Sequence, residues 1–375
     1  MKRLESLDVL RGIDLFLLVI VVPLVHSFNR SFDAAWFAPV SNQFDHVPWT
    51  GFHVIDIVMP LFLFMAGVAI PFAQKKYKSQ SRSEAWIWGR LIKRFIILWI
   101  FGMITQGRLL SLRPELFRYY DNTLQTIAVG YLFASIFYMY TTRKAQIISA
   151  AGLLVLFWGL MMFVKVGGFG GGDFGPNNLC EWVDRTVLGT HCDHWFIDDN
   201  GNGYFRAEHN YTWILSSLGF IVTTMTGMFA GELLMDPKRK ETNKLAWLFG
   251  AGAGMLAAGL LWSLQMPSIK HIWTSSFVLI SSGICFLLLG VVYFIVDYKG
   301  WKKGFMWLKV FGLNSILAYM IAENVDFSSV SKSLLYGVPN VASEGVYRFL
   351  LTLCSVLILW GILKLFDRCK IYLKA

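Results

Sequence analysis

The chain carries little charge. Asp, Glu, Lys and Arg make up only 15% of its 375 residues, and hydrophobic residues make up 55%, whereas a soluble domain needs about 25% charged residues to cover its surface. This composition excludes an ordinary soluble domain, a disordered chain, a collagen-like chain and a coiled coil. Five cysteines in the whole chain are also too few for a small disulfide scaffold. The composition therefore predicts an integral membrane protein with little material outside the bilayer.

About ten apolar runs have the length that crosses a bilayer, roughly 17–25 residues. They cover residues 9–27, 54–72, 87–107, 124–140, 145–164, 213–235, 245–262, 276–296, 304–321 and 347–366. The sequence thus predicts an all-α, polytopic membrane bundle of about ten transmembrane helices, which forms a single domain over residues 1–375. Residues 28–53 and 167–212 are expected to form long loops outside the cytoplasm.

The net charge of +10 would also suit a protein that binds nucleic acid. Most of the 34 Lys and Arg residues, however, lie on the membrane side that holds both chain ends. Because cytoplasmic loops are rich in Lys and Arg, this side is expected to be cytoplasmic. We therefore predict cytoplasmic termini, the lipid bilayer as a partner and no nucleic-acid binding.

Cys180 and Cys192 share the loop of residues 167–212. A disulfide between them is expected if this loop faces an oxidising compartment. The alternatives are two free thiols, or a zinc site completed by His191 and His194, although that spacing matches no common zinc pattern. We expect no metal.

Polar side chains inside the apolar runs or at their ends are candidates for a functional site, because a polar group is costly there. The single ones are Asp14, Asp56, Gln125 and Asn314. A denser group lies where the eighth run begins and contains Lys270, His271, Trp273 and Ser275. Each of them could instead cap a helix, anchor the chain at the membrane interface or bond its own backbone. Taken together, they favour a polar cavity that binds substrate.

His46 is the best single candidate for a catalytic residue. It lies in the segment FDHVPWTGFH, just before the second apolar run. An imidazole titrates near neutral pH and can take a proton from an attacking amine or alcohol. Asp45 or Asp56 could orient the ring and support its positive form. The alternative is an interfacial histidine without a catalytic role.

Six segments spread over nearly the whole chain carry a resemblance to a known family. They are RLESLDVLRG at residues 3–12, FDHVPWTGFHVIDIVMPLFLFMAGVAIPF at 44–72, LQTIA at 124–128, TGMFAGELL at 226–234, WTSSFVL at 273–279 and FGLNSILAY at 311–319. Together they resemble the heparan-alpha-glucosaminide N-acetyltransferase family and its bacterial relatives, which form part of a transmembrane acyltransferase superfamily. The resemblance implies an acetyl-coenzyme A-dependent enzyme of the bacterial inner membrane.

The resemblance also implies the reaction and its base. An acetyl group would pass from acetyl-coenzyme A on the cytoplasmic side to the amine of a glucosamine-type sugar on the other side. His46 stands where the family has its catalytic histidine, in a similar H-x-x-W-x-G-x-x-x-x-D pattern that Trp49, Gly51 and Asp56 complete. Many members carry an asparagine pair late in the first helix, where this chain has Val22 and Pro23. We therefore expect a small amino sugar or a short saccharide as the acceptor, rather than a heparan polymer.

The remaining candidates take roles in the same mechanism. Asp56 and Asp14 join His46 as expected catalytic residues. The donor is anionic, so we expect the cytoplasmic end of the third run to bind it through Arg90, Lys93 and Arg94, with Gln125 nearby; plain positive-inside charge is the alternative. The expected substrate-binding residues are Asp45, Trp49, Lys270, His271, Trp273, Ser275 and Asn314.

Other readings of the sequence stay open. Direct attack of the amine and a route through an acetyl-histidine both fit these residues. A sugar or ion transporter without acyl-transfer activity is the main competing function, although no internal repeat supports it. An inactive interaction partner is the third, and the chain could form a homodimer.

Overall fold

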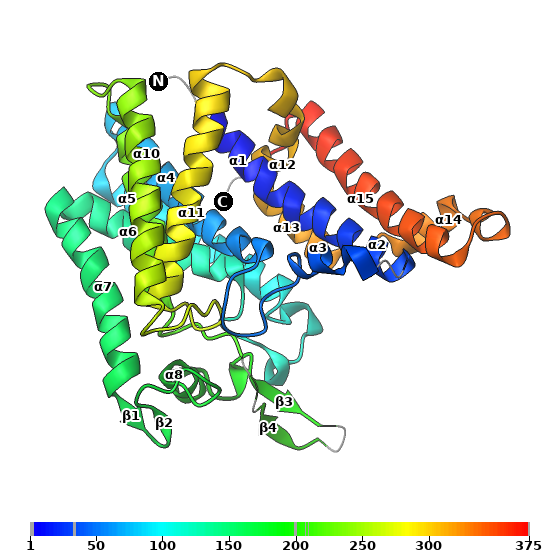
Figure 1. Ribbon diagram of the computed structural model, residues 1–375, viewed down its shortest axis with the longest axis horizontal. Helices are drawn as coiled ribbons and strands as arrows, with labels where there is room; N and C mark the ends of the chain where they lie inside the picture. The colour runs from blue at the N-terminus through cyan, green and yellow to red at the C-terminus, as the bar shows by residue number, and fades with distance from the viewer. Residues whose placement is uncertain (1–3, 33–34, 199–200, 207, 209, 374–375) are drawn as a thin grey trace. The chain divides into compact units, whose positions relative to one another are not determined.

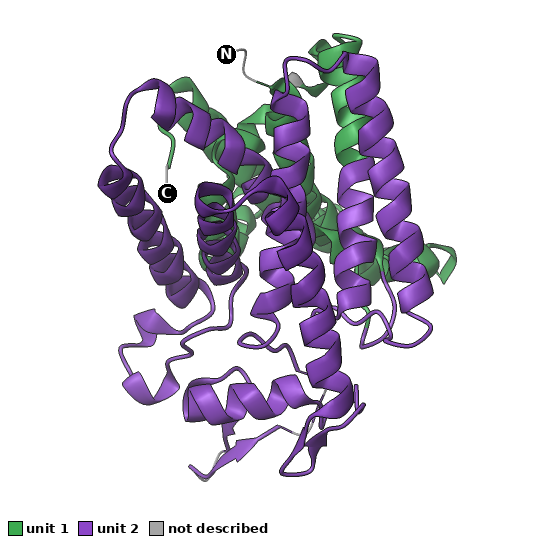
Figure 2. Cartoon of the chain, turned by 90° about the vertical axis from the view of Figure 1, so that its left-hand side faces the viewer, with its two compact units in different colours: residues 1–47, 53–58, 288–374 green, residues 48–52, 59–287, 375 purple. Residues whose placement is uncertain are grey.

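The computed structural model describes residues 4–32, 35–198, 201–206, 208 and 210–373, and helices dominate it (Figure 1). The chain forms two compact units, which Figure 2 distinguishes by colour. Unit 1 takes residues 1–47, 53–58 and 288–374, and unit 2 takes residues 48–52, 59–287 and 375.

Unit 1 starts with one continuous helical segment. It consists of α1 (Glu5–Phe16), a turn of π-helix (Leu17–Val21) and α2 (Val22–Phe32). Pro23 has no N–H to donate to the carbonyl four residues earlier, and a π-turn accommodates such a gap in the hydrogen-bond ladder. The first turn of α1 is capped by Asp297, whose carboxylate accepts from the backbone N–H groups of Glu5 and Ser6.

The other helices of unit 1 are α3 (Ala38–Asn42), α12 (Lys309–Leu313), α13 (Ser315–Asn324), α14 (Ser328–Leu334) and α15 (Glu344–Arg368). Helices α1 and α12 meet backbone to backbone. A Cβ on Gly12 would lie 2.1 Å from the carbonyl oxygen of Leu308, a separation that no side chain permits. Glu5 on α1 also accepts hydrogen bonds from Lys309 at the start of α12, at 2.8 Å, and from Lys302 in the segment before it, at 3.1 Å.

Unit 2 contains the longer helices of the middle of the chain. They are α4 (Val58–Ser79, from Met59 on), α5 (Glu84–Thr105), α6 (Thr123–Tyr140), α7 (Arg143–Phe163), α9 (Ser217–Met235), α10 (Glu241–Trp262) and α11 (Ser275–Tyr293, up to Leu287). Helices α4 and α9 also touch through glycines, because a Cβ on Gly67 or Gly227 would lie 1.9 Å from the carbonyl oxygen of Thr224 or Phe64.

The loop of residues 167–212 is largely folded. It holds α8 (Leu179–Leu188) and the antiparallel hairpin of β3 (Trp195–Ile197) with β4 (Gly203–Phe205). In this hairpin Trp195 stands opposite Phe205. The loop also holds β2 (Phe169–Gly170), which pairs antiparallel with β1 (Lys165–Val166) just before the loop.

The predicted spans agree with the structure at eight of ten positions. In the part of the chain that the structure describes, 8 helical segments are long and apolar enough to cross a membrane. The run at 87–107 becomes α5, which is long enough but carries Arg90, Lys93 and Arg94. The run at 304–321 is broken into a short 3-10 helix (Lys303–Leu308), α12 and α13, with non-helical backbone at Asn314 (φ −120°, ψ 38°).

Candidate functional site

His46 and Asp56 form a hydrogen-bonded pair within unit 1. His46 Nδ1 lies 2.8 Å from Asp56 Oδ1, and the histidine side chain is 50% exposed while the aspartate side chain is 1% exposed. A carboxylate only accepts, so Nδ1 carries the ring proton and Nε2 carries the lone pair. The pair thus combines an accessible imidazole with a buried carboxylate that fixes its tautomer, which is the arrangement of a general base.

The local fold explains why Asp56 meets His46 across ten residues. A short 3-10 helix (Val54–Ile57) precedes α4, and Asp56 Oδ2 accepts from the backbone N–H groups of His53 at 2.9 Å and Val47 at 3.4 Å. His53 Nδ1 lies 2.8 Å from the carbonyl oxygen of Asp45. These bonds fold the loop back on itself and leave Oδ1 directed at His46.

Asp45 takes a different partner from the one expected. Its carboxylate lies 3.6 Å from Nε2 of His26 on α2, and the Asp45 side chain is 61% exposed. Asp56, not Asp45, therefore orients His46. His26 was not among the predicted site residues, although it lies within the first apolar run and meets the same criterion as Asp14.

Asp14 is not brought to the His46–Asp56 pair. It is buried in α1, and among the described residues its carboxylate has no hydrogen-bond partner. His26, which contacts Asp45 beside His46, lies twelve residues further along the same helical segment. That spacing corresponds to a rise of roughly 18 Å between Asp14 and His26. Asp14 is thus a separate buried carboxyl group, and a direct catalytic role for it finds no support in this geometry.

Three of the predicted substrate-binding residues come together in unit 2. The His271 ring lies 5.2 Å from that of Trp49 and stacks at 4.1 Å on Tyr211, and the Lys270 ammonium lies 6.0 Å from the Tyr211 ring. Backbone pairing of Thr50 with Ile269 holds the two segments together. Tyr211, which joins this group, was not among the predicted site residues.

Trp273 and Ser275 take packing roles. Both are buried; the Trp273 indole donates to Thr223 Oγ1 at 3.1 Å and the Ser275 hydroxyl donates to the Leu154 carbonyl oxygen at 2.8 Å. These partners lie on neighbouring helices. Substrate binding by these two side chains finds no support in this geometry.

The amides of Gln125 and Asn314 are engaged by the backbone. Gln125 Oε1 accepts from the N–H groups of Asp121 and Asn122, and its Nε2 donates to the Tyr119 carbonyl oxygen. Asn314 donates to the carbonyl oxygen of Ile371 and accepts from the N–H of Leu373. The first closes the loop before α6 and the second holds the C-terminal segment, so neither geometry supports the predicted binding role.

The three basic residues expected at the donor site lie within two turns of α5. Arg90 and Lys93 are exposed, and the Arg94 guanidinium lies 3.9 Å from the Tyr131 ring on α6. Arg90 lies over the Trp86 ring at 5.5 Å. Donor binding by this group stays a prediction.

The predicted disulfide is wrong. Cys180 and Cys192 are free and buried. Cys180 lies in the first turn of α8, where its sulfur is 3.5 Å from Met161 Sδ on α7, whereas Cys192 lines a cavity beside Arg118. Cys180 on α8 and Cys192 beyond the end of that helix thus have different neighbours, and the spacing in the sequence could not show this.

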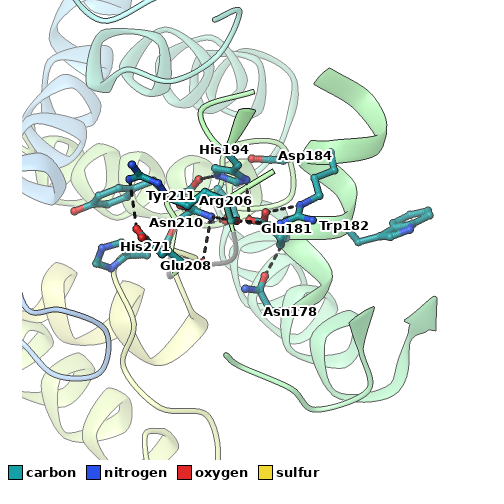
Figure 3. Close-up of polar contacts among 12 residues, drawn as sticks. Asn178, Glu181, Trp182, Asp184, His194, Arg206, Glu208, Asn210, Tyr211 and His271 are labelled. Atoms are coloured by element: carbon teal, nitrogen blue, oxygen red, sulfur yellow. Dashed lines mark hydrogen bonds and ion pairs between the residues drawn. The ribbon is translucent and has the colours of Figure 1, made fainter. Parts of the chain in front are cut away.

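A buried charged group joins α8 to the end of the same loop (Figure 3). His194 is fully buried, with Nδ1 2.7 Å from Glu181 Oε2 and Nε2 in contact with the Tyr211 carbonyl oxygen. Asp184 accepts from the backbone N–H groups of Trp213 and Ile214, at 2.7 and 2.9 Å. Nδ1 faces a carboxylate and Nε2 faces a carbonyl oxygen, both of them acceptors, so this environment favours a ring that carries two protons.

This geometry makes the stability of the loop dependent on pH. Burial lowers the pKa of His194, but the hydrogen bond and charge of Glu181, the Tyr211 carbonyl and Asp184 raise it more, and the net pKa lies above the ordinary value. A raised histidine pKa contributes stability at low pH that is lost as the pH rises through the folded-state value. Each tenfold difference in proton affinity between folded and unfolded states is worth about 1.4 kcal/mol.

We therefore expect faster hydrogen exchange in residues 178–212 as the pH rises above about 6.5, the ordinary histidine pKa, after correction for intrinsic exchange. Burial raises the pKa of Asp184 to about 7, so this carboxyl also loses stability as the pH rises, in the same direction as His194, and its effect is complete only at about pH 8. His194→Gln should weaken the dependence and leave the part that Asp184 contributes, whereas His191→Gln should keep it in full. A flat wild-type profile would contradict the imidazolium.

Comparison with known proteins adds a second line of evidence. Residues 3–178 match a domain of unknown function, DUF5009. The chain is 26% identical over 363 residues to human (Homo sapiens) heparan-alpha-glucosaminide N-acetyltransferase, covering 85% of this chain and 52% of the relative. To the mouse (Mus musculus) protein of the same name it is 23% identical over 364 residues, covering 85% and 53%. The chain thus spans about half the length of the curated relatives it matches.

The fold and the site define a multi-pass, mainly helical membrane protein with a histidine–aspartate pair. Within that class, the chain is a distant homologue of the heparan-alpha-glucosaminide N-acetyltransferases. The resemblance carried by the six sequence segments is thereby confirmed.

Proposed function

We propose that the protein is a membrane-embedded acetyltransferase. It moves an acetyl group from acetyl-coenzyme A on the cytoplasmic side to the amine of a glucosamine-type sugar on the opposite side, within one domain over residues 1–375. The observation that carries the proposal is the bond between the exposed His46 imidazole and the buried Asp56 carboxylate, in a chain homologous to proteins named as N-acetyltransferases.

The pair supplies what acetyl transfer needs. The amine nitrogen attacks the thioester carbonyl carbon, His46 Nε2 accepts the amine proton, and the carbon–sulfur bond breaks to release the coenzyme A thiolate, which then takes up a proton. Asp56 holds Nδ1–H and stabilises the imidazolium that forms. In the alternative route Nε2 itself attacks the thioester. Incubation with labelled donor alone separates the two, because only the second route leaves label on the protein.

The donor side of the proposal depends on charge and topology. Arg90, Lys93 and Arg94 on α5 would attract the phosphates of coenzyme A. The helix α5 and the broken α12–α13 segment would supply the two further crossings, giving about ten with both termini in the cytoplasm of a bacterial inner membrane. Cysteine replacements at Lys76 and Lys240 should then react with a charged thiol reagent from the cytoplasm, and one at Asn200, which lies outside the described residues, should react from outside. The reverse pattern would overturn this orientation.

The acceptor is proposed to be a small amino sugar or a short saccharide. Purified protein incubated with radiolabelled acetyl-coenzyme A and a panel of amino sugars should yield labelled N-acetyl sugar. Folded protein that binds the donor and labels none of the panel would count against the proposal. Sugar uptake into proteoliposomes without acetylation would favour a transporter instead.

A further inference from the structure

A small cavity in unit 2 has no part in the proposed transfer of the acetyl group. It lies between the segment around residues 108–118 and the segment around 190–197 and has a volume of about 220 Å³. The residues that line it include two aromatic residues, two arginines, a glutamate and a threonine, namely Trp195, Phe196, Arg108, Arg118, Glu115 and Thr190. Pockets for drug-sized ligands are larger, roughly 300–1,000 Å³, so this cavity suits a single ring.

The aromatic wall is held in place by its neighbours. Phe205 meets the Trp195 ring edge-on at 4.8 Å, and a Cβ on Gly203 would lie 1.9 Å from the same ring. The backbone of β4 therefore lies directly against the indole. The Phe196 ring has the guanidinium groups of Arg206 and Arg118 over it, at 4.1 and 5.5 Å. A fixed aromatic surface loses little conformational entropy when a ligand binds.

The polar wall offers hydrogen-bonding groups without a net charge. Arg118 is paired with Asp193. Arg108 and Glu115 are exposed and line the cavity, and among the described residues no hydrogen bond or ion pair engages their side chains. Asp193 balances Arg118, and Glu115 is the carboxylate of the lining that stands against Arg108. Planar guanidinium and carboxylate groups can each bond two adjacent polar atoms of a ligand.

We propose that this cavity binds one pyranose ring of a saccharide. The C–H face of such a ring packs against Trp195, and its neighbouring hydroxyl groups bond to Arg108, Glu115 and Thr190. The combination accounts for the size, the aromatic wall and the balanced charge together. The inference goes beyond the proposed function because it needs no acetyl donor; only the choice of glucosamine as one probe rests on that function.

Saturation-transfer-difference NMR on the full chain in nanodiscs, without acetyl-coenzyme A, tests the proposal with glucose, glucosamine and inorganic phosphate. Both sugars should receive saturation at their ring protons. Their affinity should fall at least about tenfold, the equivalent of one lost interaction of roughly 1.4 kcal/mol, in Trp195→Ala and in Arg108→Ala. Arg108→Ala removes an exposed side chain, so it should leave the fold intact. Trp301→Ala, which removes a 70% exposed indole, is the matched control and should bind as the wild type does.

Sugar affinities unchanged in both cavity variants would overturn the proposal. A second result would also overturn it: phosphate raises the Tm, this rise requires Arg108, and neither sugar binds. That result would define an anion site. Loss of acetyl transfer in the separate activity assay leaves this binding result untouched, so the two proposals fail independently.

Discussion

The His46→Ala protein should lose acetyl transfer by about 10²–10⁴-fold, the usual contribution of a positioned general base. The imidazole is half exposed, and Asp56 keeps its bonds from Val47 and His53 when the ring is removed. Folding and donor binding should therefore persist. Turnover of labelled acetyl-coenzyme A with glucosamine measures the loss, and equilibrium binding of coenzyme A checks the fold.

Two comparisons make this result specific to the base. Added imidazole should restore part of the rate of His46→Ala, because it can enter the vacated and exposed position. His53→Ala removes another histidine of the same loop, whose ring bonds a backbone carbonyl oxygen. Loss of that hydrogen bond costs about 1 kcal/mol of stability, so this variant should retain most of the turnover. A folded, donor-binding His46→Ala protein that works at nearly the wild-type rate would remove His46 from the mechanism.

Asp56→Asn is expected to lower the rate by a similar factor, about 10²–10⁴-fold, although it changes one atom. Oδ2 of Asp56 accepts from two backbone N–H groups while Oδ1 faces His46 Nδ1. In the variant the amide oxygen must stay with the backbone donors, so its NH₂ group faces Nδ1. The ring then takes the opposite tautomer, with the proton on Nε2, and can no longer accept the proton of the amine.

The Asp56→Asn effect should fall on kcat and leave the KM for acetyl-coenzyme A nearly unchanged. Asp45→Asn is the matched control for the tautomer, because this exposed carboxylate faces His26 and not His46, and its kcat should change little even if its predicted role in substrate binding changes the KM for the sugar. Equal losses in the two variants would show that negative charge near the loop matters, rather than the tautomer. Full activity of Asp56→Asn would exclude Asp56 as the residue that orients the base.

Sequence reasoning identified the His46–Asp56 pair only as a possibility. Asp45 and Asp56 are both within reach of His46 along the chain, and the choice between them depends on the 3-10 turn of residues Val54–Ile57 and its bonds to Val47 and His53. The charged group around His194 went unrecognised for a related reason. Its partners, Glu181 and Tyr211, lie on either side of it in the sequence and meet only because α8 and the following segment fold together.

The sequence by itself determined the class of the protein and most of its helices. Hydrocarbon cannot hydrogen-bond to the backbone, so spanning segments must be apolar helices, and composition and run length reveal them directly. The run at 304–321 was apolar enough to look continuous, yet its break at Asn314 follows from bonds to Ile371 and Leu373, more than fifty residues away.

Only the tertiary structure decided what each polar group does. Gln125, Trp273, Ser275 and Asn314 have the chemistry of binding residues, but each bonds the backbone or a neighbouring helix. Cys180 and Cys192 likewise have the spacing for a disulfide and face different neighbours. The physical reason is that a buried donor or acceptor must find a partner, and whether that partner is a ligand or the protein itself depends on which distant segments the fold brings beside it.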